Sequence, residues 1–420
     1  MLGRKFTRVG TASAAVALLA ATPALATDGY FLNGVGAKAK GMGGVAIALP
    51  QDTLSIVSNP AAGTFIGHRL DGGVEIFVPD RAAGIRGNAA GPDARFGGNG
   101  SNPFVLPEIG YVRPLSDRVA IGIAISGNGG MNTNYRDNPF ARFGATGPAG
   151  VNLQQLFVSP TLSARIAPGH GIGIAPVIAV QSFRANGLQP FAAASADPQH
   201  FTDRGTSWSA GVGVRVGYLG QLTDWLSVGA FYQSKIATGR FNRYAGLFED
   251  RGSFDIPASY GAGLAVKLVP ALTIAADYKR IDYAGVGAVG NPLAPLFRGV
   301  PFGVAGGPGF GWRDVNVIKV GASVAVSPRW QLRAGYGHSD NPVPPSQTFL
   351  NILAPGVVQD HFTLGATYTT RSGVEITGFA MHAPKRRVEG RGSIPASFGG
   401  GEADIHLGET SIGLSFGKRF

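Results

Sequence analysis

The chain has 420 residues, of which 65 are glycine, 15% are charged and none is cysteine. Glycine, at about 15%, is twice its usual share, and soluble domains carry about 25% charged residues. The absence of cysteine excludes disulfide scaffolds, thiolate zinc sites, iron–sulfur clusters and cysteine nucleophiles. The net charge of +11 is scattered rather than gathered in patches, which argues against nucleic-acid binding. This composition is typical of a membrane β-barrel.

The N-terminus has the three features of a secretory signal peptide. Basic residues lie between Arg4 and Arg8, an uncharged apolar run covers 14–21, and the Ala-Leu-Ala of 24–26 fits a cleavage site. The alternative, a transmembrane anchor, needs about 20 strongly apolar residues, and this run is shorter. We therefore expect 1–26 to be a signal peptide and the rest of the chain to be exported.

Period-two alternation recurs along the rest of the chain. From Trp208 to Tyr218, every second residue is apolar or aromatic, and the residues between them are glycine, serine or arginine. A strand with one apolar face and one small or polar face shows this pattern, in a membrane barrel or in a soluble β-sandwich. The pattern predicts fourteen strands, at 69–78, 105–114, 118–127, 151–166, 171–186, 205–219, 224–239, 252–268, 271–283, 312–326, 329–339, 359–370, 373–388 and 405–420.

The lengths of the predicted connections favour a barrel over a sandwich. Short turns such as 115–117 and 269–270 alternate strictly with long connections such as 79–104 and 284–311. Outer-membrane barrels have short periplasmic turns and long extracellular loops, whereas a sandwich has no reason to alternate them. We therefore predict an all-β fold, in which residues 69–420 form a 14-stranded antiparallel transmembrane β-barrel in the outer membrane of a Gram-negative cell.

Aromatic and basic residues near strand ends indicate contacts with the membrane. Aromatic girdles at the two interfaces are typical of such barrels. The candidates include all four tryptophans, Trp208, Trp225, Trp312 and Trp330. The terminal Phe420 ends an amphipathic strand, which suits recognition by barrel-assembly machinery. The Lys-Arg-Arg of 385–387 fits either lipopolysaccharide phosphates or a solvated basic loop.

Residues 27–68, before the first strand, do not alternate. They are small and rich in glycine, and they carry few charges. The segment is too long for a tail and too short for a domain. A barrel of about fourteen strands has a lumen wide enough to need a plug. We therefore expect this segment to be a hatch folded into the lumen.

Three stretches resemble the FadL/TodX family of outer-membrane transporters of hydrophobic compounds. The first runs from Asp-Gly-Tyr-Phe at 28–31 to the Asn-Pro-Ala of 59–61. The second covers 109–130, and the third runs from Trp-Arg-Asp at 312–314 to Asp-Asn-Pro-Val-Pro at 340–344. The resemblance implies substrate capture in an apolar groove between extracellular loops. It also implies sideways release into the membrane where the third strand kinks.

The resemblance assigns residues to the hatch and to the kink. The hatch residues are Tyr30, Phe31, Asn59, Pro60 and Ala61, and the kink residues are Asn128, Gly129 and Gly130. Glycine and asparagine reach positive φ and interrupt a strand ladder, but an ordinary strand-to-loop turn uses them too. The Asn-Pro pair has two interpretations, a buried tie between hatch and wall or a solvated turn.

Two long loops carry the apolar residues that predict the capture groove. These residues are Leu188, Phe191, Phe201, Phe241, Tyr244, Leu247 and Phe248. Exposed apolar side chains that cluster on loops indicate a binding surface, although such side chains also pack loops against one another. For a carboxylate head group, the candidate contacts are Lys319 and Arg333, on the small-residue faces of two adjacent strands. The alternative is that both cations pair with lumenal acids.

These features predict a passive transporter rather than an enzyme. The sequence shows no nucleophile–base motif and no metal-ligand spacing, so we expect no catalytic residues, metal or cofactor. The expected partners are a hydrophobic small molecule, either a long-chain fatty acid or an aromatic hydrocarbon, outer-membrane lipid and lipopolysaccharide, and the assembly machinery. The alternatives from other classes are an adhesin or structural barrel, and a lipase.

Overall fold

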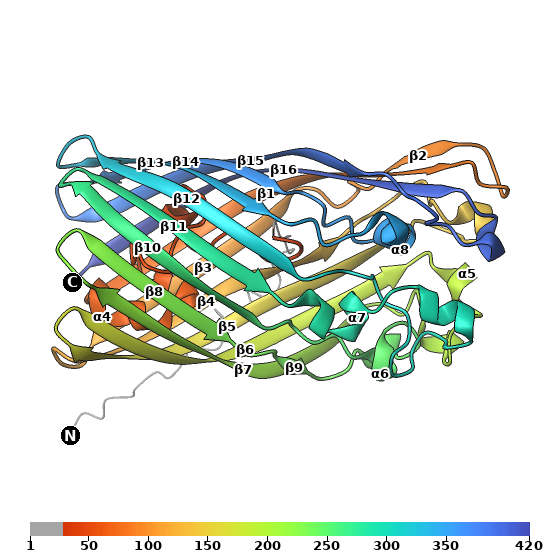
Figure 1. Cartoon of the computed structure of the whole chain (residues 1–420), viewed down its shortest axis with the longest axis horizontal. Coiled ribbons are helices and arrows are strands. Elements are labelled where there is room, and N and C mark those ends of the chain that lie inside the picture. Colours follow the sequence, from red (N-terminus) through yellow and green to blue (C-terminus); the bar gives the residue numbers. More distant parts are fainter. Residues whose placement is uncertain (1–27) are drawn as a thin grey trace, which may run out of the picture.

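The computed structural model describes residues 28–420, and its fold is a closed antiparallel β-barrel (Figure 1). The predicted signal peptide lies outside these residues. The strands are β1 (Arg69–Arg86), β2 (Ala94–Gly97), β3 (Phe104–Pro114), β4 (Val119–Asn132), β5 (Gly150–Ala167), β6 (His170–Asn186), β7 (Ser207–Gln221), β8 (Leu226–Gln233), β9 (Ala237–Thr238), β10 (Ser259–Val269), β11 (Leu272–Ile281), β12 (Val315–Ala325), β13 (Trp330–Ser339), β14 (Asp360–Thr369), β15 (Val374–Val388) and β16 (Glu402–Arg419).

The wall has the fourteen strands that the alternation predicts. They are β1, β3 to β8 and β10 to β16, each paired with its neighbours in chain order, while β2 and β9 are short additions beside β1 and β7. The barrel closes because β1 pairs with β16 from Arg69 opposite Arg419 to Arg86 opposite Glu402. Short turns and Phe420 lie at one end, the turn end, and the long connections lie at the other, the loop end (Figure 1).

The alternation places apolar side chains outside the wall and polar or small ones inside. On β1, Leu70, Val74 and Ile76 are exposed, whereas Asp71 and Glu75 between them are buried. Lipid around a membrane barrel accepts the first set, and the lumen accepts the second. The sequence pattern therefore reports directly on which medium each residue meets.

The helices are all short, and they lie inside the barrel or in the loops. They are α2 (Ala37–Lys40), α3 (Ser55–Ser58), α4 (Gly63–Ile66), α5 (Gln189–Ala192), α6 (Glu249–Gly252), α7 (Gly287–Gly290) and α8 (Thr348–Asn351), with 3₁₀ turns η1 (Pro60–Ala62), η2 (Ala141–Phe143), η3 (Pro198–His200), η4 (Asn242–Tyr244), η5 (Tyr283–Gly285), η6 (Ala294–Arg298), η7 (Pro345–Gln347) and η8 (Ala396–Phe398). Within residues 28–420, no helix is long and apolar enough to cross a membrane.

Residues 28–67, called the hatch below, run inside the barrel near the turn end (Figure 1). Glycines on the inner face of the wall make room for this segment. A Cβ atom on Gly173 of β6 would lie 2.2 Å from the carbonyl carbon of Pro60, and one on Gly335 of β13 would lie 2.1 Å from the nitrogen of Gly43. The glycine-rich faces of the wall strands are therefore the surface on which the hatch packs.

Strand boundaries differ from the predictions mainly at the loop end. β1 continues to Arg86 rather than ending at 78, because its pairing with β16 persists where Asp80 and Arg81 interrupt the apolar pattern. The predicted strand 252–268 begins only at Ser259. Residue Ile256 lies outside β10 and bridges Ile236 instead, at the break between β8 and β9.

The predicted girdle is wrong at one tryptophan. Trp208, Trp225 and Trp330 are exposed on the outer surface, but Trp312 is buried. β12 begins only at Val315, so Trp312 precedes the wall strand. Its Nε1 donates a hydrogen bond of 2.6 Å to Oδ1 of Asn351, inside the barrel.

Candidate functional site

The start of the hatch is anchored in the lumen by charge and by aromatic packing. Oδ2 of Asp28 lies 2.8 Å from Nζ of Lys279 and 3.0 Å from Nζ of Lys319. Although burial opposes ionisation, these cations lower the pKa of Asp28 to about 2. The backbone nitrogen of Tyr30 donates to the hydroxyl of Tyr283 at 3.1 Å, and the two rings lie 5.1 Å apart. The segment therefore has a defined position across the lumen.

The wall is interrupted between its second and third strands, β3 and β4. β4 pairs with β5 almost to its end, with a bulge between Gly127 and Gly129. On its other side, β4 pairs with β3 only as far as Ile125, opposite Ile109. The remaining β3 residues pair with β1 alone. Gly129 has φ of +128°, a conformation that excludes most side chains. We call this interruption the β3–β4 gap.

Residues of the hatch occupy the inner side of the β3–β4 gap. The nitrogen of Leu32 donates to the carbonyl of Asn128 at 3.0 Å, and the nitrogen of Gly130 donates to the carbonyl of Tyr30 at 3.0 Å. The side chain of Leu32 packs against the cluster of Phe77, Phe104, Leu106 and Met381. Lipid offers no hydrogen bonds, so backbone groups of β4 that lack a strand partner need another one. The hatch backbone provides it.

The gap also has a boundary at the loop end. There, Nη1 of Arg81 donates to the backbone oxygen of Asn132 at 2.6 Å and to its Oδ1 at 2.8 Å. At the turn end, the boundary is the Ile109–Ile125 pair. The interruption of pairing therefore has a defined length along β4, and it is also called the window below.

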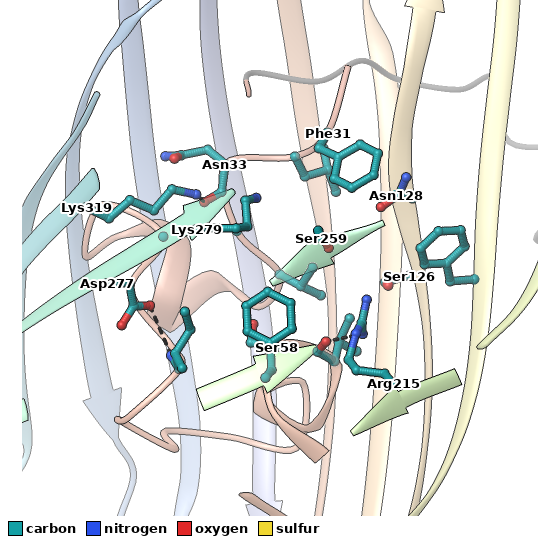
Figure 2. Close-up of a pocket in the computed structure, with 18 of the residues that line it drawn as sticks. Phe31, Asn33, Ser58, Ser126, Asn128, Arg215, Ser259, Asp277, Lys279 and Lys319 are labelled. Atoms are coloured by element: carbon teal, nitrogen blue, oxygen red, sulfur yellow. Dashed lines mark hydrogen bonds between the residues drawn. The ribbon is translucent and has the colours of Figure 1, made fainter. Parts of the chain in front are cut away.

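A small chamber lies beside the residues of β4 at the gap, and Phe31 forms part of its lining (Figure 2). We call it the lower chamber. Its lining includes the β4 residues Ser126, Gly127 and Asn128, the aromatic residues Phe31, Phe157 and Phe231, and the charged residues Arg215, Asp277, Lys279 and Lys319. The chamber is therefore adjacent to the window and has both apolar and cationic walls.

Two further cavities lie on the other side of the hatch segment. One is a small cavity lined by Tyr30, Arg81, Trp312, Ala354 and Glu409. The other is a small cavity between the loops, and Leu353 is part of its lining. Leu353 lines the cavity between the loops, and the adjacent Ala354 lines the cavity at Tyr30. Tyr30 lines that same cavity, and the adjacent Phe31 lines the lower chamber. The three cavities therefore follow one another along the barrel.

The loop residues predicted to form an exposed groove are instead buried. Leu188, Phe191, Phe201, Phe241, Tyr244 and Phe248 are buried, and Leu247 is half-buried. The expectation of exposure is wrong because the loops fold onto one another, as in the contact of Phe201 with Phe302, whose ring centroids lie 5.3 Å apart. Five of the seven line the cavity between the loops, namely Leu188, Phe191, Phe201, Leu247 and Phe248.

The Asn-Pro-Ala of the hatch forms a buried tie to the wall rather than a solvated turn. Nδ2 of Asn59 donates to the carbonyls of Ile47, at 2.8 Å, and of Tyr218, at 2.9 Å. Its Oδ1 accepts from the nitrogen of Ala61 at 3.1 Å. The carbonyl of Pro60 accepts from Ser163 of β5 at 2.6 Å. One asparagine side chain thus joins two parts of the hatch to β7.

The structure separates the two candidate carboxylate contacts. Lys319 lines the lower chamber and shares Asp28 with Lys279, as the alternative of acid pairing requires. Arg333 is absent from the described lining of the chamber, and it donates to Gln51, Thr367 and Gln331. Sequence reasoning missed Arg215, although this residue is the single cation on the glycine and serine face of the pattern between Trp208 and Tyr218.

The basic triplet at the loop end is compensated by acids. Lys385 pairs with Asp80 at 2.5 Å, Arg386 with Asp360, and Arg387 with Asp404 at 2.8 Å. Contact of this triplet with lipopolysaccharide stays a prediction.

Comparison with known proteins identifies the family. The sequence profile of the family described as "Outer membrane protein transport protein (OMPP1/FadL/TodX)" matches residues 15–388. No curated protein sequence matches the chain. The fold is similar to a Pseudomonas aeruginosa FadL homologue, at 18% identity and a TM-score of 0.70 over 93% of this chain and 100% of that one.

Two solved toluene transporters have the same fold. TodX of Pseudomonas putida is 19% identical, with a TM-score of 0.66 over 92% of this chain and 99% of that one. TbuX of Ralstonia pickettii is 17% identical, with a TM-score of 0.65 over 92% and 99%. At these identities the solved structures show a shared fold, whereas the match to the family profile is a similarity of sequence and covers most of the chain. The chain therefore belongs to the OMPP1/FadL/TodX family of outer-membrane transport proteins.

Proposed function

We propose that the protein takes up long-chain fatty acids or similar hydrophobic molecules across the outer membrane, passively, and releases them sideways through the β3–β4 gap. The observation that carries this proposal is the window itself, where β4 leaves β3 beyond Ile125 and the hatch backs the opening. A continuous wall would oblige a substrate to leave through the turn end, which the hatch occupies. The window offers a shorter route into lipid.

The physical cost of crossing water favours such a route. An acyl chain that enters water loses about 0.8 kcal/mol per methylene. The cavities along the barrel are lined by Phe191 and Phe248 between the loops, by Tyr30 at the hatch and by Phe157 beside the window. A substrate that moves from one to the next keeps apolar contacts throughout. The buried loop residues are thus proposed as the entry to this path.

Uptake of aromatic hydrocarbons is the second candidate. The cavity between the loops has phenylalanine rings on several sides, including Phe183, Phe201 and Phe302. Such a lining suits a flat aromatic ring through edge-to-face contacts. Two structurally similar proteins are described as toluene transporters. An adhesin is disfavoured because the apolar loop residues turn inward around a cavity instead of presenting a polar surface.

The test is uptake by cells that lack their own transporters of this kind and express the full chain. Initial rates are measured with radiolabelled oleate and with radiolabelled toluene, and lipids that co-purify with the barrel are identified by mass spectrometry. Faster uptake of either compound than in the same cells without the protein supports the proposal. If, for both compounds, the rate in cells with the protein equals the rate in cells without it, transport is contradicted and the adhesin becomes the favoured function.

A further inference from the structure

Four strands form an open pocket on the outer side of the barrel at the loop end, where β2 lies (Figure 1). We call it the outer pocket. Its lining includes Arg86 of β1, Arg95 of β2, Arg387 of β15, and Asp404 and His406 of β16. Gly84 of β1 pairs with Arg95 on one side and with Asp404 on the other. The outer pocket is therefore built on paired strands rather than on a loop.

The outer pocket lies on the lipid-facing side of these strands but beyond their apolar part. The pairing of β1 with β16 has no register shift, so Gly84 and Arg86 share a face with the exposed Ile76 and Val78. Val78 is the last large apolar residue that is exposed on β1, and Gly84 lies six positions further on. A rise of about 3.3 Å per residue and a tilt of about 40° place the pocket about 15 Å beyond the apolar surface, toward the loop end.

One buried carboxylate in the outer pocket holds two of the three guanidinium groups. Asp404, which is 4% exposed, accepts from Nε of Arg86 at 3.0 Å and from an Nη atom of Arg387 at 2.8 Å. Arg387 also contacts the exposed Glu389 at 3.2 Å. The side chains of the two arginines are 44% and 43% exposed. Because a guanidinium has five N–H donors, both keep donors for a ligand in the pocket.

The other two polar side chains, those of Arg95 and His406, have no partner within residues 28–420. Neither forms an ion pair or a side-chain hydrogen bond there, although both line the outer pocket. Arg95 is exposed, so water can solvate it. His406 is only 8% exposed. A buried imidazole without a hydrogen-bond partner loses its hydration uncompensated, and a ligand in the pocket would restore the missing bond.

These donors fit a phosphate group better than a carboxylate. Guanidinium groups bind both anions through charge-assisted hydrogen bonds. A phosphate monoester has three terminal oxygens and a charge of about −1.5 to −2 near pH 7. Three oxygens can accept from donors that approach from several strands at once, and here the donors belong to β1, β2, β15 and β16.

The height of the outer pocket indicates where this phosphate comes from. In outer-membrane barrels the long loops lie on the cell exterior, so the pocket lies on the lipopolysaccharide side. Polar head groups extend only about 5–8 Å beyond each face of the hydrocarbon core. The phosphates of phospholipids and of lipid A, next to their acyl chains, therefore lie below the pocket. Phosphates on the core sugars of lipopolysaccharide lie further out, at the height of the pocket.

We propose that the outer pocket binds a phosphate group on the core sugars of lipopolysaccharide, through the guanidinium groups of Arg86, Arg95 and Arg387. The ring of His406 donates a further hydrogen bond, and Asp404 positions two of the arginines. The proposal does not depend on uptake, because the outer pocket shares no lining residue with the three cavities inside the barrel.

The proposal also divides the basic triplet of 385–387. Lys385 pairs with Asp80 and Arg386 pairs with Asp360, and both lysine and arginine lie outside the lining of the outer pocket. Only Arg387 reaches the pocket. The contact with lipopolysaccharide therefore belongs to three strands that are distant in sequence and not to the triplet as a unit.

The test compares two lipopolysaccharides on the purified full-length barrel. One is a rough form with a phosphorylated core, and the other is a deep-rough form that keeps the lipid A phosphates but ends before the phosphorylated sugars. Binding of each labelled form is measured by fluorescence in detergent. The unaltered barrel should bind the phosphorylated core about tenfold more tightly. Arg95→Gln, which leaves the bonds of Asp404 in place, should remove most of this preference and leave binding of the deep-rough form unchanged.

Arg371→Gln and Arg386→Gln are the matched controls. Arg371 is exposed in the turn between β14 and β15, and Arg386 is exposed at the loop end but outside the lining. Both variants lose the same charge as Arg95→Gln, and both should keep the preference. An equal loss in all three variants would show that only net charge matters and would overturn the proposal. Equal binding of the two lipopolysaccharides by the unaltered barrel would overturn it too.

Inorganic phosphate distinguishes the lipid from a free anion as the source of the phosphate. It is titrated as a competitor against the rough lipopolysaccharide. We expect displacement only at a large excess, because the free ion lacks the sugars and acyl chains that hold the lipid beside the barrel. If inorganic phosphate binds as tightly as the rough lipopolysaccharide, the outer pocket is a site for a free anion and the proposal is wrong.

Discussion

The wall holds the hatch in two different ways, on β1 and on β4. β1 has a strand partner on both sides over most of its length, and its side chains hold the hatch. Glu75 of β1 accepts from Lys40 at 2.7 Å, and Asp71 accepts from Thr53. β4 has lost one partner, and its backbone holds Tyr30 and Leu32 by two hydrogen bonds.

The two attachments differ in the energy needed to break them. Removal of one partner from a buried ion pair leaves an uncompensated charge, at a cost of about 3–5 kcal/mol. A backbone hydrogen bond contributes about 1 kcal/mol net, and water can replace it. We infer that the body of the hatch stays on β1 and that Asp28 stays on Lys279 and Lys319, while the backbone around Leu32 moves at the gap. The predictions below test this contrast.

The largest effect is expected where the hatch meets β1. Nζ of Lys40 lies within 2.9 Å of carboxylate oxygens of both Glu75 and Glu108. Lys40→Met leaves both acids buried without their cation, so we expect stability to fall by about 3–5 kcal/mol and the hatch to loosen. Urea unfolding and conductance in planar bilayers measure the two effects. Glu75→Gln and Glu108→Gln, added together, should restore a closed barrel; persistent conductance in that triple variant would assign the defect elsewhere.

The next effect concerns the window. Valine at Gly129 and Gly130 disfavours the positive φ of Gly129 and favours regular pairing of β4 with β3. We expect uptake to fall at least about tenfold, while ligand binding and heat-modifiability on gels persist. Uptake and binding are measured on the same preparation. Full transport through the straightened strand would refute sideways release.

Valine substitutions elsewhere in the wall provide the control for the window. A Cβ atom on Gly378 of β15 meets another atom only at 3.9 Å, so this position has room. The Gly378→Val variant should transport at the unaltered rate. A loss equal to that at Gly129 and Gly130 would show that any stiffening of the wall blocks transport.

A smaller effect is expected from the pH dependence of the hatch attachment. Burial, and then the neighbouring carboxylate of Asp71 on β1, raise the pKa of Asp52 to about 6. An unfolded aspartate titrates near pH ~3.9. Between these values the native chain holds a proton that the unfolded chain has lost, so stability falls as pH rises through this window.

Asp52→Asn removes this penalty. We expect the heat-unfolding midpoint at pH 7 to rise by a few degrees and the slope between pH ~4 and ~6 to flatten. Asp117→Asn, in an exposed turn, should change neither quantity. An unchanged slope in Asp52→Asn would mean that another group titrates in this range.

The same contrast explains what the sequence could predict. The order of the strands and the place of the hatch could be predicted from local patterns. Along a strand such as that between Trp208 and Tyr218, every second residue faces lipid and is apolar, and the residues between them face the lumen or the hatch and are small or polar. The burial of Phe191 and Trp312 depends on how distant loops fold onto one another, which no local pattern encodes. Arg215 had a signal, a lone cation on a glycine face, but its missing counter-ion became evident only when the strands were brought together.

The smallest effect is expected at the side chain that fills the gap. A Cβ atom on Gly127 of β4 would lie 3.5 Å from Leu106 of β3 and 4.0 Å from Leu32, so Leu32 lies close to both strands at the gap. Leu32→Ala leaves a void there and keeps the backbone bonds of the hatch. If the side chain obstructs the exit, initial uptake should rise about twofold, since a barrier change of about 0.4 kcal/mol suffices.

Leu49→Ala, in a hatch cluster away from the gap, provides the control and should leave the rate unchanged. The combination with valine at Gly129 and Gly130 sharpens the test. If Leu32 acts only where β4 is unpaired from β3, Leu32→Ala should not change the uptake rate of the variant in which valine restores that pairing. The effects of the two changes on the uptake rate will then not be additive. A twofold rise that persists in the closed wall would mean that Leu32 controls a step before the window. The contrast between β1 and β4 would then describe the anchoring of the hatch but not the exit of the substrate.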